Sequence, residues 1–158
     1  MVRVTDIADE IKQTRSFKDK STEAALALLR TASLLRRKAE AITLREGISL
    51  QQYNVLRILR GARGPLPTME IAARLVEPAP GITRFVNSLE EKGLIRREQW
   101  PGDRRQVLCQ ITAAGLKLLE RLDGDIDKAD SEATGELSGE QIDVLLDFLS
   151  EIRRANAP

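Results

Sequence analysis

The chain has 158 residues and a formal charge of +1, because 25 lysines and arginines face 24 acidic residues. Its composition, 42% hydrophobic and 31% charged, predicts a soluble globular fold, and its lack of histidine excludes imidazole-based zinc sites and histidine-dependent nucleophilic catalysis. The single cysteine predicts a reducing, cytoplasmic location, and the short apolar runs and acidic start predict that the chain neither spans a membrane nor is exported. With one cysteine and no histidine, we expect no enzyme, metal or cofactor.

The N-terminal third of the chain predicts an arm followed by two helices. Residues 1–18 carry a weak helical pattern, which predicts a short helix or arm that must pack on something else. Residues 21–44 predict a long helix, because their apolar residues recur in alternating steps of four and three. Gly47 ends this helix, and the capping box of Ser49 and Gln52 begins another that reaches Gly61.

Two short helices follow. The first starts at Pro67 and ends near Val76. The second runs from Gly81 to Lys92, with Pro80 placed in its first turn and Gly93 closing its C-terminal end. Its inward stripe comprises Ile82, Phe85, Val86 and Leu89. Two short helices joined by a tight turn predict a helix-turn-helix.

The periodicity then changes from 3.6 to 2, which predicts a β-hairpin. One strand runs from Ile95 to Trp100, the turn contains Pro101 and Gly102, and the second strand ends at Ile111. A hairpin after a helix-turn-helix is a wing. Cys109 alternates in phase with apolar residues of its strand, so we expect a buried core thiol.

The C-terminal segment predicts two more helices. Thr112 caps a long one, and the capping box of Ser138 and Gln141 begins the last. The predicted fold is therefore mainly α with a small β-hairpin wing (α+β), a winged helix-turn-helix with N- and C-terminal dimerisation helices. Its predicted parts are an arm and dimerisation helix at 1–48, the winged helix-turn-helix at 49–112, and the dimerisation helices at 113–158.

The outward face of the second short helix carries side chains suited to base recognition. Arginine binds two acceptors of guanine, and asparagine binds the donor and acceptor of adenine. A glycine at the helix start lets free backbone amides approach a phosphate. An ordinary solvated helix face is the alternative interpretation. The candidate DNA-binding residues on this helix are Gly81, Thr83, Arg84, Asn87 and Ser88.

The hairpin adds four arginines, at positions 96, 97, 104 and 105, which suit phosphates and a narrow minor groove. Arg97, Arg104 and Arg105 are further candidate DNA contacts, with Arg104 at the wing tip. Asp103 would repel phosphate, so we expect a structural role in which it pairs with Arg105 or holds turn amides. A solvated charged hairpin is the alternative.

The order and content of these segments resemble the MarR family of bacterial winged helix-turn-helix transcriptional regulators. The resemblance rests on Pro67 to Ala72, Pro80 to Leu94, and Asp103-Arg104-Arg105 followed by Thr112-Ala113-Ala114-Gly115. It implies a homodimer with intertwined terminal helices, a recognition helix in each major groove and a wing at each flanking minor groove. Tyr53 is either a core residue or part of the family's effector cleft, between the dimerisation and DNA-binding regions.

The resulting prediction is a sequence-specific double-stranded DNA-binding regulator, a repressor that acts as a homodimer on a pseudo-palindromic operator and responds to a small phenolic or aromatic-acid effector. The alternatives are an effector-independent architectural DNA-binding protein and a helical protein-interaction module. The charge is unevenly distributed, at +3 for residues 1–50, +4 for 51–111 and −6 for 112–158. Positive charge therefore accompanies the predicted DNA-binding part.

Overall fold

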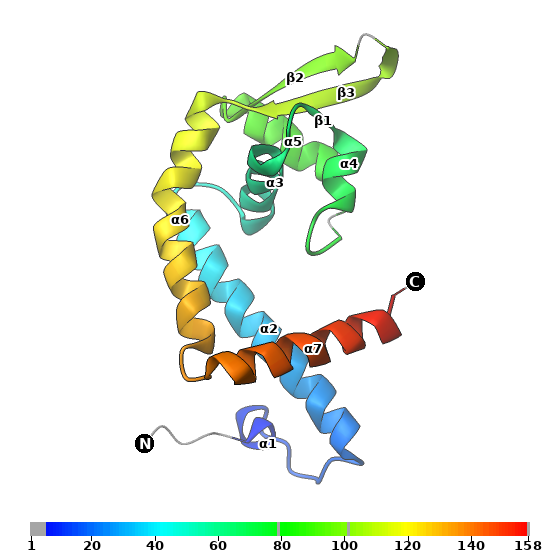
Figure 1. Cartoon of the computed structure of the whole chain (residues 1–158), viewed down its shortest axis with the longest axis vertical. Helices are drawn as coiled ribbons and strands as arrows, with labels where there is room; N and C mark the ends of the chain where they lie inside the picture. The colour runs from blue at the N-terminus through cyan, green and yellow to red at the C-terminus, as the bar shows by residue number, and fades with distance from the viewer. Residues whose placement is uncertain (1–5, 79, 101, 158) are drawn as a thin grey trace.

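The computed structural model describes residues 6–78, 80–100 and 102–157, apart from the side chains of Arg104 and Arg105. Figure 1 shows a lobe of short helices and a hairpin at one end of two long helices. The helices are α1 (Ile7–Glu10), α2 (Lys20–Arg45), α3 (Leu50–Gly61), α4 (Thr68–Ala73), α5 (Ile82–Glu91), α6 (Ala113–Thr134) and α7 (Gly139–Ala155). The strands are β1 (Leu66–Pro67), β2 (Ile95–Trp100) and β3 (Asp103–Ile111). In the described ranges no helix is both long and apolar enough to cross a bilayer.

The helices begin and end where local sequence signals predict. Capping boxes at Ser49 and Ser138 satisfy free amides at the starts of α3 and α7, and the Thr112 hydroxyl accepts from the third amide of α6. Gly47, with φ +71°, ends the turn after α2 in a conformation that favours glycine. α6 also continues through Gly124 without a break.

Two short helices differ from the prediction at their ends. α4 ends at Ala73, several residues before Val76, which lies in the following loop and is 87% exposed. Pro80 lies outside α5, because Gly81 is the N-cap in a left-handed conformation with φ +93° and the helix begins at Ile82. The connection between the two helices is therefore longer than predicted.

The sheet has three antiparallel strands in the order β1-β3-β2. Its hairpin was predicted, but β1 was not, since two residues are too short to show any periodicity. Leu66 lies opposite Cys109 and Pro67 opposite Leu108, while Arg97 of β2 lies opposite Cys109 from the other side. β3 is therefore central, which explains why Cys109 is fully buried.

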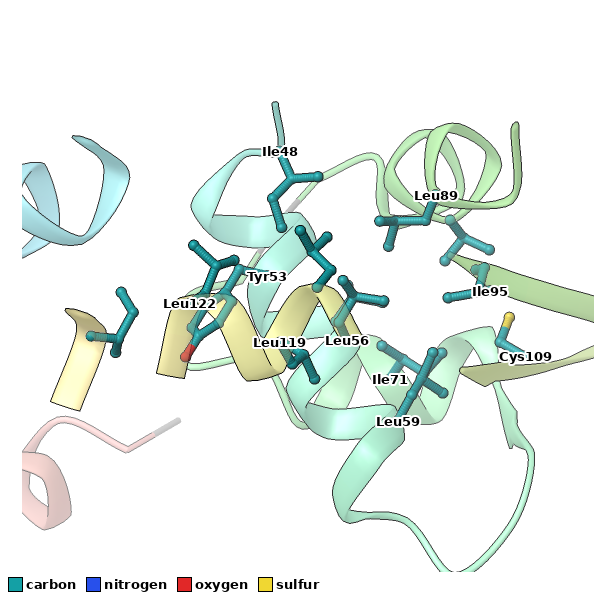
Figure 2. Packing of buried hydrophobic residues seen from close by; sticks show 14 residues of the cluster. Ile48, Tyr53, Leu56, Leu59, Ile71, Leu89, Ile95, Cys109, Leu119 and Leu122 are labelled. Atoms are coloured by element: carbon teal, nitrogen blue, oxygen red, sulfur yellow. The ribbon is translucent and has the colours of Figure 1, made fainter. Parts of the chain in front are cut away.

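One hydrophobic core joins the short helices, the sheet and the start of α6 (Figure 2). Leu89 of α5 and Ile95 of β2 pack there with Leu56 of α3 and Leu119 of α6. Burial of such side chains contributes about 1.5–3 kcal/mol each. The core therefore fixes α5 and the hairpin on a rigid base.

Three ion pairs fasten α6 to the preceding helices. Arg60 of α3 binds Asp123 with both guanidinium nitrogens, at 2.6 and 3.2 Å. Arg45 at the end of α2 binds Asp125 at 2.8 Å, and Arg121 binds the carboxylate of Glu46 at 2.8 Å. Asp123 therefore links α6 to α3 in the lobe, whereas the other two pairs link α6 to the C-terminal end of α2.

The far ends of the long helices are little covered by the rest of the described chain, although α1 contacts α2 there and Arg30 of α2 binds Glu10 at 3.3 Å. α7 runs away from the end of α6 and contains no buried residue, and Thr43 is the buried residue of α2 (Figure 1). Large apolar side chains therefore remain exposed on both helices. They include Leu28, Leu29, Leu34 and Leu35 of α2 and Val144, Leu145, Leu146, Phe148 and Ile152 of α7.

Candidate nucleic-acid interface

α5 buries one face and exposes the other. Val86 and Leu89 are buried in the core, whereas Thr83, Arg84 and Asn87 are exposed. This division follows the helical repeat, since residues three or four apart share a face. Three of the five candidate residues on this helix therefore project together from a rigid element.

The start of α5 is open. Gly81 is the N-cap and provides no side-chain hydrogen bond to the first amides of the helix. Those amides, together with the positive end of the helix dipole, form a suitable contact for a phosphate. The left-handed φ of Gly81 explains why a glycine occupies this turn, because other residues adopt that conformation only with strain.

Ser88 differs from the other candidates on α5. Its hydroxyl accepts a 3.0 Å hydrogen bond from the Gln52 side-chain amide of α3, and the residue is half-buried. Gln52 itself is 8% exposed and also closes the capping box at Ser49. Ser88 thus anchors α5 to α3 rather than projecting outward. The capping motif revealed Gln52 in the sequence, but its second contact depends on the packing of two helices.

Arg97 points back to α5 instead of away from the hairpin. Its Nε donates to a carboxylate oxygen of Glu90 at 2.6 Å, its Nη2 pairs with the same carboxylate, and its Nη1 donates to Asn87 Oδ1 at 2.7 Å. This guanidinium lowers the pKa of Glu90, whose carboxylate in turn raises the pKa of Arg97. The negative charge of Glu90, which alone would oppose a phosphate near α5, is therefore paired.

Arg96 is the other arginine of the hairpin whose side chain is described, and it points away from Arg97. Arg96 lies on the other side of β2, where its guanidinium donates to Gln110 at 3.1 and 2.6 Å and pairs with Glu98. Arg104 and Arg105 lie in β3, and their side chains fall outside the described residues. The predicted contact between Asp103 and Arg105 therefore also falls outside them, while Asp103 accepts from Gln106 at 3.3 Å.

Comparisons with known proteins agree with this geometry. The family model described as "MarR family" matches residues 48–107. A putative transcriptional regulatory protein for the hcr operon of Thauera aromatica is 30% identical over 122 residues, which cover 77% of this chain and 73% of that relative. The chain belongs to the MarR family. It is therefore assigned to a family of DNA-binding transcriptional regulators, as the helix-turn-helix and hairpin indicate.

Solved structures agree on the fold. The MarR transcription factor from Planctomyces limnophilus is 34% identical, with a TM-score of 0.66, and the match covers 85% of this chain and 98% of that one. A MarR-family transcriptional regulator from Streptomyces coelicolor, crystallised with DNA, is 22% identical with a TM-score of 0.76 and coverage of 92% and 93%. The predicted winged helix-turn-helix with mainly helical surroundings is confirmed.

The motif after the wing has a packing reason in this MarR-family protein. Thr112 accepts from the Gly115 amide and donates through its hydroxyl to the Gly93 carbonyl. A Cβ at Gly115 would lie 2.3 Å from the Leu94 carbonyl oxygen and 2.7 Å from Ile111 Cγ1. The start of α6 therefore contacts the base of the wing so closely that only a hydrogen fits at position 115.

Tyr53 is a core residue that also lines a cavity. It is 2% exposed, its burial raises the pKa of its phenol, and the Arg57 guanidinium lies 5.8 Å from its ring centroid. The cavity has a volume of about 280 Å³ and lies between α2, α3, α6 and the loop after α4. Its lining includes Leu35, Arg36, Ala39, Leu50, Tyr53, Asn54, Arg57, Leu75 and Ile126. Tyr53 is therefore a core residue, as one of the two interpretations predicted, and it also borders this cavity.

Proposed function

We propose that this protein is a homodimeric repressor that recognises a pseudo-palindromic operator, and that a small phenolic or aromatic acid modulates its DNA affinity. The observation that carries the proposal is the exposed face of α5, where Thr83, Arg84 and Asn87 project from a helix fixed by the core beside a hairpin. Arginine and asparagine in this position suit the donor and acceptor pattern of the major groove.

The unpartnered apolar faces support a dimer. α7 is a 17-residue helix without a buried side chain, yet Phe148 is 59% exposed and Leu146 is 53% exposed. Exposed apolar faces of this extent are typical of association surfaces. We therefore assign residues 1–48 and 113–158 to dimerisation and 49–112 to DNA binding. A two-fold dimer matches an operator whose half-sites lie about 10 base pairs apart or a multiple of that spacing.

The dimer is tested by placing a charge on α7. Phe148→Glu is expected to convert the wild-type dimer to a monomer in light scattering and to weaken operator binding, because a buried carboxylate is costly. Val76→Glu is the matched control, since Val76 is 87% exposed and lies in the loop after α4, outside the segments assigned to dimerisation. If Phe148→Glu stays dimeric, the assigned surface is wrong.

The operator is tested by selecting bound duplexes from a random library with the wild-type protein. A palindromic consensus is expected. If a folded dimer selects no consensus, the proposal of sequence-specific binding is wrong. Arg84→Ala should then weaken binding to the consensus by about 10- to 100-fold. Lys128→Ala also removes one positive charge, but from α6 beside Glu132, and should change affinity by less than about two-fold.

The dimer represses transcription if its operator overlaps DNA that RNA polymerase must bind. An effector that lowers the affinity of the dimer for the operator then restores transcription. The cavity beside Tyr53 supports the effector, because Arg36 and Arg57 provide guanidinium groups for a carboxylate and the phenol lies next to an apolar wall. The Arg36 guanidinium pairs with the cavity residue Glu77 at 3.6 Å, so a bound acid would take the place of that carboxylate. Benzoic and hydroxybenzoic acids are expected to raise the melting temperature and release the operator.

Arg36→Met should abolish this response, whereas Arg37→Met should keep it, because Arg37 does not line the cavity. A protein that binds its consensus unchanged at millimolar concentrations of every such acid would instead be an effector-independent DNA-binding protein. Equal loss of response in both variants would place the acid elsewhere on α2. Repression is tested by measuring a reporter gene placed behind the operator. Its expression is expected to rise in cells that lack the protein.

A further inference from the structure

Arg97 donates a hydrogen bond to the side chain of Asn87, the residue type on α5 that is suited to adenine. We propose that it turns the Asn87 amide oxygen away from DNA, so that Asn87 recognises acceptor atoms in the major groove through Nδ2 instead of forming the two-bond contact with adenine. This inference rests on the proposed role of α5 in operator recognition. It changes the base that this residue prefers and makes Arg97 a specificity-determining residue that positions Asn87.

The orientation of the amide follows from the chemistry of its partner. A guanidinium has five donors and no acceptor, so the Asn87 atom that faces Arg97 must be the oxygen. Arg97 Nη1 lies 2.7 Å from Asn87 Oδ1. A flipped amide would bring two donors together and lose this hydrogen bond. Nδ2 is therefore directed to the other side of the amide.

Glu90 fixes the guanidinium in turn. It lies three residues after Asn87 on α5, so both side chains share one face of the helix. Its carboxylate accepts from Arg97 Nε at 2.6 Å and pairs with Nη2, which leaves Nη1 directed at Asn87. The three side chains thus form one network that joins β2 to α5. Arg97 is 29% exposed and Glu90 is 37% exposed, so bulk water covers only part of the network.

This network changes what Asn87 offers to a base. The two-bond contact with adenine requires the amide oxygen to accept from the N6 amino group while Nδ2 donates to N7. An oxygen that already accepts from a guanidinium, with a positive charge beside it, is a poor acceptor for another amino group. The Nδ2 hydrogens stay available and are polarised by the bond on the opposite side of the amide. Guanine and thymine present acceptors for such a donor, at O6 and N7 or at O4.

A purely structural role of Arg97 predicts a different outcome. If Arg97 only fastens the hairpin to α5, its removal should lower the melting temperature and the overall affinity while every base preference stays as it was. A positioning role predicts a change at one base pair of each half-site. The base preference therefore separates the two roles.

The main experiment compares duplexes selected from a random library by three proteins. Arg97→Met keeps a long side chain but removes the donors, so Asn87 regains its oxygen. At one position per half-site, adenine is expected to rise about five- to tenfold relative to guanine and thymine. Arg96→Met is the matched control, because it removes the same charge from the neighbouring residue of β2, whose guanidinium binds Gln110 instead of α5. It should keep the wild-type base preference.

A second variant leaves Arg97 in place and keeps the test independent of its role in folding. Asn87→Asp retains an oxygen for Arg97 but replaces the Nδ2 donor by an acceptor. The same position is then expected to favour cytosine, whose N4 amino group is a donor. Circular dichroism and melting temperature establish that each variant is folded.

The results separate this inference from the proposal on which it rests. If the wild-type protein selects no consensus, the operator proposal fails. If it selects a consensus but folded Arg97→Met keeps the wild-type preference at every position, the positioning role of Arg97 is overturned. If Asn87→Asp also keeps that preference, Asn87 does not contact a base, and the inference is wrong irrespective of Arg97.

Discussion

The start of α6 offers a sharp test of the packing at the base of the wing. Gly115 and Gly124 lie in the same helix, yet a Cβ at Gly115 would meet the Leu94 carbonyl oxygen at 2.3 Å, while a Cβ at Gly124 would meet nothing within 4 Å. Glycine to alanine raises helix propensity by about 0.8–1 kcal/mol at an exposed interior site. Gly124→Ala should therefore stabilise the protein by about that amount.

Gly115→Ala should do the opposite. Ordinary contacts begin near 3.4 Å, so the backbone around Leu94 or Ile111 must move to accommodate the new methyl group. Overpacking typically costs about 1–3 kcal/mol. The same movement strains the 3.1 Å hydrogen bond from the Thr112 amide to the Leu94 carbonyl, which contributes about 1 kcal/mol. After the gain in propensity is subtracted, the net destabilisation is about 1–3 kcal/mol.

Urea denaturation of both variants and the wild-type protein, at one protein concentration, measures the two effects. Gly115→Ala should lower the denaturation midpoint with little change in slope, and Gly124→Ala should raise it. The reasoning is refuted if Gly115→Ala is as stable as the wild-type protein, because the close contact would then have no energetic weight. A loss of stability in Gly124→Ala would show that propensity does not govern that site.

Three further results are expected. The Cys109 thiol is fully buried and burial raises its pKa, so native protein should react with a thiol reagent at least about 100-fold more slowly than protein in urea, and equal rates would contradict its burial. The ion pair with β2 lowers the pKa of Glu90 from its ordinary value of 4.5, so the unfolded chain binds more protons in acid and stability falls as the pH drops below that value. In Glu90→Gln, the melting temperature should decrease less between neutral and acid pH than in the wild-type protein. In the neighbouring Glu91→Gln, more of the wild-type decrease should remain, and identical curves for the two variants would refute the assignment. Arg60→Met removes the two-bond contact with Asp123 and should cost about 1 kcal/mol at low salt, with a smaller loss in 1 M salt because ions screen the pair; a loss independent of salt would indicate packing instead.

Much of the secondary structure follows from short stretches of sequence. The capping boxes at Ser49 and Ser138 and the threonine cap of α6 each involve residues within three positions of one another, so the sequence alone predicts the starts of these helices. The apolar stripe of α5 likewise follows the helical repeat, which predicts correctly that Val86 and Leu89 are buried. Local geometry determines such features before any tertiary contact forms.

Tertiary packing decided the features that join distant segments. β1 exists because Leu66 and Pro67 lie beside β3, and two residues carry no periodic signal of their own. Ser88 was expected to project outward, but Gln52 lies 36 positions earlier and binds its hydroxyl. The apolar pattern identifies the buried face of a helix to within a residue. Whether a side chain at the edge of that face projects into solvent or binds another helix depends on the helix packed beside it.

The composition of the hairpin illustrates the same division. Its arginines, and the positive charge of residues 51–111, indicate a nucleic-acid partner despite the overall charge of +1. Composition alone treats Arg96 and Arg97 as equivalent, although alternate residues of a strand face opposite sides. The fold directs Arg97 to Glu90 and Asn87 and Arg96 to Gln110. The helix-turn-helix, the wing and the charge they carry can be predicted from the amino-acid sequence, because they depend on local periodicity and residue type. Which of those charges is paired depends on tertiary packing, because pairing requires short distances between segments that are far apart in the chain.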